Sequence, residues 1–172
     1  MHDPRPHLGE PLALDLLDTR WNQHGHPQDL LTDVAGLGVW LASAGLTDRT
    51  IADQATLDAL RAARTAVYDV VQSATHTALN EVLDHGRIRR TLTDAGPENV
   101  IDVPDIAWLP AWLAADNLLH LLAEAPDRIR QCAHPDCVLF FYDTSKNGTR
   151  RWHSMATCGN RAKAARHYAR KP

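Results

Sequence analysis

Three cysteines and a histidine in the C-terminal part of the chain have the spacing of a metal site. Cys132 and Cys137 enclose four residues, and His153 and Cys158 enclose four more. The two pairs together offer three thiolates and one imidazole, a donor set that zinc binds in tetrahedral geometry. Because four protein ligands leave no open coordination position, we predict one structural zinc ion (Zn2+) per chain.

Three other interpretations of these residues stay open. His134 lies between the first two cysteines and is an alternative fourth ligand, although the spacing of His153 to Cys158 favours His153. A disulfide would leave one of the three cysteines unpaired. Buried cysteines without a ligand are common in protein cores, yet they do not usually cluster in pairs beside a histidine.

A short strand, a turn and a helix are expected to position the ligands. Residues 138–142 form an apolar, β-like run between the two pairs. Asn147-Gly148 is a strong turn signal, because both residues tolerate positive φ. The helix-prone run 162–166 follows Cys158. A knuckle, a hairpin and a helix that carries the last ligand together describe a treble-clef-like finger.

The same residues carry a family resemblance. The run Cys158-Gly159-Asn160-Arg161, preceded by residues 152–155 and 143–148, is similar to the CGNR zinc-finger family, and this likeness covers about a quarter of the chain. Members carry an N-terminal, mainly helical ABATE domain and are described as stress-induced transcriptional regulators of bacteria. The resemblance extends more loosely to residues 14–19, 30–46 and 57–64. The family usually has a cysteine where this chain has His153, and a histidine there is still a competent ligand.

The fold class predicted from the pattern is mainly α. A helical, ABATE-like body with a short β-hairpin is expected over residues 1–127, for sensing or dimerisation, and the zinc finger over residues 128–172. The body holds enough apolar sequence for its own core, so we expect it to fold without the metal. The finger, with few large apolar side chains, should depend on zinc.

Helical periodicity is clearest in three stretches of the body, residues 30–44, 57–74 and 104–124. Pro110 should split the last stretch, because proline lacks the N–H that a helix interior needs. That helix is apolar enough to be central either to the core or to a dimer interface. Residues 87–93 and 99–103 are predicted to form the hairpin, and residues 22–27 a loop.

The charge of the chain is divided unevenly between its two parts. Residues 1–127 hold eight Lys and Arg against nineteen acidic residues, whereas residues 128–172 hold ten against two. A formal charge of −3 for the whole chain therefore combines an acidic body with a finger of +8. Such asymmetry points to nucleic acid or another acidic partner. A finger that docks on its own acidic body would explain it equally well.

The basic side chains of the finger are the candidate DNA contacts. Those expected on the last helix are Arg161, Lys163, Arg166 and Arg170, and those expected at the turn are Lys146, Arg150 and Arg151. Lys and Arg neutralise phosphates and release counterions, which gives affinity without sequence specificity. Charge alone favours a solvated helix as much as a DNA contact, and the family resemblance favours DNA. We also expect Ala162, Ala165 and Ala169 to pack on the hairpin.

The sequence therefore favours a DNA-binding transcriptional regulator over an enzyme. A protein-interaction module, and a small-molecule-binding protein or enzyme with a pocket in the body, remain the alternatives. The candidate partners are DNA, a second copy of the chain and a small-molecule effector. No uninterrupted apolar run reaches the roughly twenty residues of a membrane span, and the N-terminus lacks the build of a signal peptide. We therefore expect no membrane partner and a cytoplasmic protein.

Overall fold

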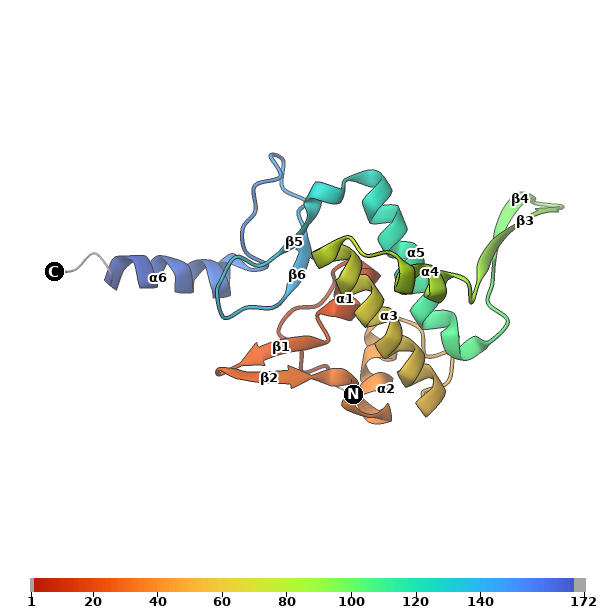
Figure 1. The fold of residues 1–172 in the computed structure, drawn as a ribbon, viewed down its shortest axis with the longest axis horizontal. Helices are drawn as coiled ribbons and strands as arrows, with labels where there is room; N and C mark the ends of the chain where they lie inside the picture. Colours follow the sequence, from red (N-terminus) through yellow and green to blue (C-terminus); the bar gives the residue numbers. More distant parts are fainter. Residues whose placement is uncertain (1, 169–172) are drawn as a thin grey trace.

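The structure is a computed structural model that describes residues 2–168. Within these residues, helices alternate with three small antiparallel sheets of two strands each (Figure 1). The elements are α1 (Leu12–Leu17), β1 (Arg20–Gln23), β2 (His26–Asp29), α2 (Val34–Ser43), α3 (Gln54–Ser73), α4 (Thr77–Leu83), β3 (Arg87–Thr93), β4 (Gly96–Asp102), α5 (Leu109–Glu124), β5 (Ile129–Gln131), β6 (Phe140–Tyr142) and α6 (Asn160–Tyr168). Single 3₁₀ turns occupy Leu30–Thr32, Ile106–Trp108 and Pro126–Arg128, and a π-helical turn occupies Met155–Gly159.

Helices α1, α3 and α5 form the centre of the body and pack against one another. Leu14 of α1, Leu60 and Val67 of α3, and Leu118 of α5 are all fully buried. Trp40 of α2 is buried as well, and its indole N–H donates to Asp15 Oδ2 at 2.9 Å. The apolar periodicity of the sequence therefore does mark the faces that meet in the core.

Helix α5 is a core helix. It begins at Leu109 with Pro110 in its first turn, as predicted, because proline has no N–H to lose there. Most of its large apolar side chains are buried, and Leu119 is the exposed exception among those described. Of the two roles expected for this helix, a place in the core is confirmed, and a dimer interface stays a prediction. By length and composition alone Ile106–Glu124 could cross a membrane, which is weak evidence because the core helix of a soluble protein passes the same test.

Helix α3 shows how local sequence sets the boundaries. Asp53 caps its start, and its side chain accepts a hydrogen bond from Thr56 N at 2.8 Å. The helix ends at Ser73, and Ala74 adopts the left-handed conformation with φ of +52°. The helical stretch expected to end at residue 74 therefore ends at this C-cap, and α4 starts at Thr77 after a short break.

The predicted loop over residues 22–27 is instead a hairpin, in which β1 pairs with β2. His24 and Gly25 form its turn with φ values of +51° and +80°, the conformation that a two-residue hairpin needs. The strands are polar and largely exposed, so alternating hydrophobicity did not reveal them. The second hairpin, β3 with β4, was predicted and extends away from the helices in Figure 1.

The finger shares the core of the body. Leu139 and Phe140 belong to the same buried cluster as α1 and α3. The backbone N–H of Phe140 donates to Asp18 Oδ1 at 2.7 Å, and that of Tyr142 donates to Glu10 Oε2 at 2.8 Å. Strand β6 is thus bonded on one edge to carboxylates of the body.

The fold class is confirmed: a mostly helical body with small hairpins precedes a small sheet, a Cys₃His group and a helix. The strand pairing within the finger differs in detail from expectation. Strand β6 pairs with β5, which precedes Cys132, so the cysteine knuckle itself connects the two strands. The Asn147-Gly148 turn lies in a loop between β6 and the π-helical turn.

Candidate metal centre

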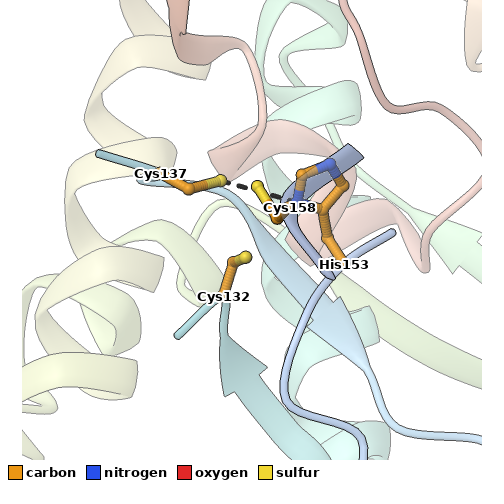
Figure 2. Close-up of side chains that lie close together, drawn as sticks. All are labelled: Cys132, Cys137, His153 and Cys158. Carbon is orange, nitrogen blue, oxygen red and sulfur yellow. Dashed lines mark hydrogen bonds between the residues drawn. The ribbon is translucent and has the colours of Figure 1, made fainter. Parts of the chain in front are cut away.

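Four side chains from separate parts of the finger converge on one point. One donor atom each from Cys132, Cys137, His153 and Cys158 lies within 4.8 Å of every other (Figure 2). Cys132, His153 and Cys158 are buried, and Cys137 is partly exposed. The four residues named from spacing alone are therefore brought together.

Backbone hydrogen bonds shape the knuckle that holds the first two cysteines. Cys132 N donates to Leu139 O at 2.9 Å, which closes the hairpin at the end of β5 and β6. Cys137 N donates to His134 O at 3.0 Å, which turns the chain back. Ala133 N donates to Arg151 O at 2.8 Å, and this bond holds the segment that leads to His153 beside the knuckle.

His153 and His134 differ clearly in position. Nδ1 of His153 lies 3.5 Å from Cys137 Sγ, and its Nε2 lies 3.4 Å from the Thr157 hydroxyl. A metal-binding histidine commonly uses its second ring nitrogen in such a contact, which fixes the orientation of the ring. His134 Nδ1 instead accepts from Asp136 N at 3.2 Å, and His134 is not one of the four convergent residues.

Cys158 sits in the π-helical turn that leads into α6. Ser154 caps this turn, and Gly159 N donates to Ser154 O at 3.0 Å. Arg161 NH2 lies 3.1 Å from Cys158 Sγ, so a guanidinium faces the thiol. Three thiolates and a divalent cation leave one net negative charge, and Arg161 offsets it.

The cysteine thiols cannot all ionise without a cation between them. A hydrogen bond from Cys137 lowers the pKa of Cys132, which makes Cys132 the first thiolate. That same bond raises the pKa of Cys137. Burial, followed by the negative charge on Cys132, raises the pKa of Cys158. A bound divalent cation would remove this conflict, because zinc ligation stabilises the thiolate form.

The spacing of the donor atoms fits a tetrahedral metal. With zinc–sulfur bonds of about 2.3 Å and zinc–nitrogen bonds of about 2.05 Å, sulfur and nitrogen lie about 3.6 Å apart in a tetrahedron. The observed distance from Cys137 Sγ to His153 Nδ1 is 3.5 Å. The group is suited to one metal ion, and a hollow of about 90 Å³ beside it is lined in part by Cys137, His153 and Arg161.

A second group of residues, whose role sequence reasoning missed, holds the loop between β6 and the π-helical turn. The buried carboxylate of Asp143 accepts from Ser145 N and Arg150 N, both at 2.9 Å. Burial alone would raise the pKa of Asp143, but the hydrogen bonds from Ser145 and Arg150 outweigh burial and lower it. Arg128 donates to the carbonyls of Asp143 and Ser145, both at 2.7 Å. An aspartate two residues before a serine was the available signal.

The candidate DNA contacts occupy different environments. Lys146, Arg151, Arg161 and Lys163 are exposed. Arg150 instead donates to the carbonyls of Trp152 and His153, and its guanidinium stacks 4.5 Å above the Phe141 ring. Arg166 lies within α6, whereas Arg170 lies outside the described residues, as do Lys171 and Ala169.

The alanines expected to pack on the hairpin differ in exposure: Ala162, at the start of helix α6, is partly buried. The helix extends away from the rest of the molecule in Figure 1. Among the described residues, most of its contacts are with the π-helical turn that precedes it. Ala165, which was expected to pack on the hairpin, is exposed.

Two family models match the chain. The model described as "CGNR zinc finger" matches residues 128–171. The ABATE model, described as "Putative stress-induced transcription regulator", matches residues 10–125 and so covers more than half of the chain. A comparison with curated proteins finds no match.

Proposed function

Because this chain belongs to the ABATE family of CGNR zinc-finger proteins, we propose that it is a DNA-binding transcriptional regulator. The finger would be built on one structural zinc and would present α6 to DNA. The body would serve for sensing or dimerisation. A cytoplasmic location follows from this role.

The proposed zinc ligands are Cys132, Cys137, His153 and Cys158. The observation that supports a structural rather than a catalytic ion is the convergence of four protein donors on one point. A catalytic zinc keeps one position for water or substrate, whereas a four-ligand site has none. The ion would hold the knuckle, the loop before His153 and the start of α6 together.

The observation that carries the DNA-binding proposal is a basic helix that leaves the body directly from the metal centre. Arg161 in the first turn of α6 contacts Cys158 just before it, so a metal bound by Cys158 would fix where α6 starts. A nine-residue helix is marginally stable alone in water. Contact with DNA would stabilise it, and its exposed alanines would let the backbone approach a groove closely.

The described side chains divide the candidate contacts into two groups. Lys146, Arg151 and Lys163 are exposed, and the guanidinium of Arg151 lies 5.1 Å from the centre of the Trp152 ring. Arg150 and Arg161 are held by the finger itself, through backbone carbonyls and the Cys158 thiol. We therefore assign Arg150 a role in folding the finger, and Arg161 a role in neutralising the metal centre.

The test is binding of the zinc-loaded protein to duplex DNA of random sequence over a series of salt concentrations. If three to five phosphates are neutralised per chain, the log–log slope of affinity against salt should be about −3 to −4.5. Replacing Lys163, Arg166 and Arg170 by Glu should abolish binding and leave the zinc content at one per chain. A variant that binds as the parent does would show that this helix does not contact DNA.

A matched control separates local contact from overall charge. Replacing Arg49, Arg89 and Arg90 of the body by Glu changes the net charge by the same amount at exposed positions outside the finger. We expect this control to reduce the affinity far less than the finger variant. Equal losses from both variants would indicate a general charge effect and refute a contact through α6.

A further inference from the structure

A cavity of about 650 Å³ lies where the body meets the finger. Its walls come from three places: the β1–β2 hairpin, one face of α3, and the start of β6. Pockets for small molecules typically measure about 300–1,000 Å³. The cavity is therefore large enough for a ligand with one or two fused rings.

The walls of the cavity are mainly apolar and aromatic. Trp21, Tyr68 and Phe140 contribute three rings, and Leu17 and Val138 contribute aliphatic surface. Tyr68 and Phe140 meet edge to face, with ring centroids 6.2 Å apart. Tyr68 and Val138 are 47% and 39% exposed, so two of the exposed apolar side chains of the protein gather in this one hollow. Such a surface favours a flat, apolar ligand.

The polar edge of the cavity carries one excess positive charge. Arg64 and Asp29 form a two-bonded ion pair at 2.7 and 2.8 Å, and they neutralise each other. Arg20 Nε donates a hydrogen bond to Asp29 Oδ2 at 3.1 Å, and the Arg20 side chain is 61% exposed. Its guanidinium is therefore accessible to an anionic group on a ligand, a geometry for which arginine is well suited.

We propose that this cavity binds a small aromatic carboxylate. The ring system would lie among Trp21, Tyr68 and Phe140, and the carboxylate would pair with Arg20. None of these residues is one of the four that converge at the metal centre. Ligand binding at the cavity does not require that the finger binds DNA.

The same cavity is joined to the metal centre through the knuckle. Asn22, which lines the cavity, donates from Nδ2 to the Asp136 carbonyl at 2.9 Å. Val138, which lines it from the other side, directly follows Cys137. A ligand would thus touch both the hairpin and the segment that holds a proposed zinc ligand. Such a ligand would therefore alter the affinity of the finger for DNA, an effect that rests on the function proposed above.

Titration calorimetry with 2-naphthoate tests the binding site directly, without DNA. The zinc-loaded full chain should bind one 2-naphthoate, and the neutral 2-naphthamide should bind at least about tenfold more weakly, because it cannot form the charge-assisted pair. Arg20→Gln should weaken 2-naphthoate by a similar factor and leave 2-naphthamide unchanged. Arg49→Gln, at an exposed arginine elsewhere, should behave as the parent does.

A second variant fills the cavity. Val138→Trp should abolish binding of both compounds, whereas Ile51→Trp at another exposed apolar position should not. Thermal melting of each variant confirms that it is folded. The proposal is overturned if the protein does not bind 2-naphthoate or if it binds 2-naphthoate and 2-naphthamide equally well. It is also overturned if binding survives Val138→Trp. DNA affinity is then measured with and without 2-naphthoate. If the protein binds no DNA in either case, only the proposed function is refuted. If it binds DNA with the same affinity in both cases, only an effect of the ligand on DNA binding is refuted.

Discussion

Replacing Phe140 by Ala should destabilise the body although the residue belongs to the finger. Phe140 is 3% exposed, lies in the main core cluster and meets Tyr68 of α3 edge to face. Truncating a buried phenylalanine to alanine costs about 3–5 kcal/mol. For a domain of this size each kcal/mol lowers the melting temperature by about 2–4 °C. A loss of about 4 kcal/mol therefore predicts a fall of about 8–16 °C.

The neighbouring phenylalanine is the matched control. Phe141 is also fully buried, but it points to the opposite face of β6, under the Arg150 guanidinium and outside the main cluster. Phe141→Ala should mainly ease zinc removal by a chelator, whereas Phe140→Ala should mainly lower the temperature at which helix circular dichroism is lost. Equal shifts of helix melting in the two variants, or a shift below about 2 °C for Phe140→Ala, would refute a core shared by body and finger.

Three further predictions concern single sites. His153→Ala should lower the zinc content and the zinc affinity far more than His134→Ala, whereas His153→Cys should keep the site. Elemental analysis and competition with a chelator measure these effects, and the reverse order would place the fourth ligand at His134. Gly36→Ala should lower the melting temperature strongly, because an added Cβ would lie 1.7 Å from the Leu30 carbonyl oxygen. An added Cβ at Gly38 would meet nothing within 4 Å, so Gly38→Ala should be neutral or stabilise the protein by about 0.5–1 kcal/mol. Similar melting temperatures for the two variants would contradict the close packing of α2. Burial raises the pKa of Asp18 despite the hydrogen bond from Phe140 N, so its contribution to stability is present below its unfolded pKa of about 4 and is lost as pH rises through the folded pKa. The melting temperature of Asp18→Asn should therefore fall less than that of the parent between pH 5 and pH 8. Asp33→Asn, at an exposed helix cap, should follow the parent. If the melting temperatures of Asp18→Asn and the parent change in parallel with pH, Asp18 is not the titrating group.

The parts of the fold that the sequence predicted are those set by local rules. The metal group could be predicted because ligand spacing within a short segment is itself the signal. Helix α3 could be predicted because its apolar residues recur at helical spacing from Leu57 to Ala74. Pro110 marked the start of α5 for the same kind of reason, since a proline fits only the first turn of a helix.

The parts that escaped prediction depend on partners distant in the chain. The bond from Phe140 N to Asp18 joins residues 122 positions apart, and no local pattern announces it. Strand β5 has three residues, too few to show an alternation, and its identity depends on pairing with β6. The cavity needs walls from β1, α3 and β6, so it exists only once the finger has packed on the body. The exposure of Ala165 likewise reflects the absence of packing against a described neighbour, which a helical wheel cannot show.

The opposite charges of body and finger suggested that the finger docks on the body through ion pairs. The described contacts between them are of another kind: Asp18 and Glu10 of the body accept hydrogen bonds from backbone N–H groups of β6. Each ion pair formed by the described residues lies within the body or within the finger. Docking therefore uses apolar side chains and hydrogen bonds, from backbone N–H groups of β6 and from the side-chain amides of Asn22 and Gln72, and it does not involve exposed cations such as Lys163. Because an acidic body repels phosphates, DNA would approach from the side on which α6 projects, and the repulsion would keep the body and its cavity away from the duplex.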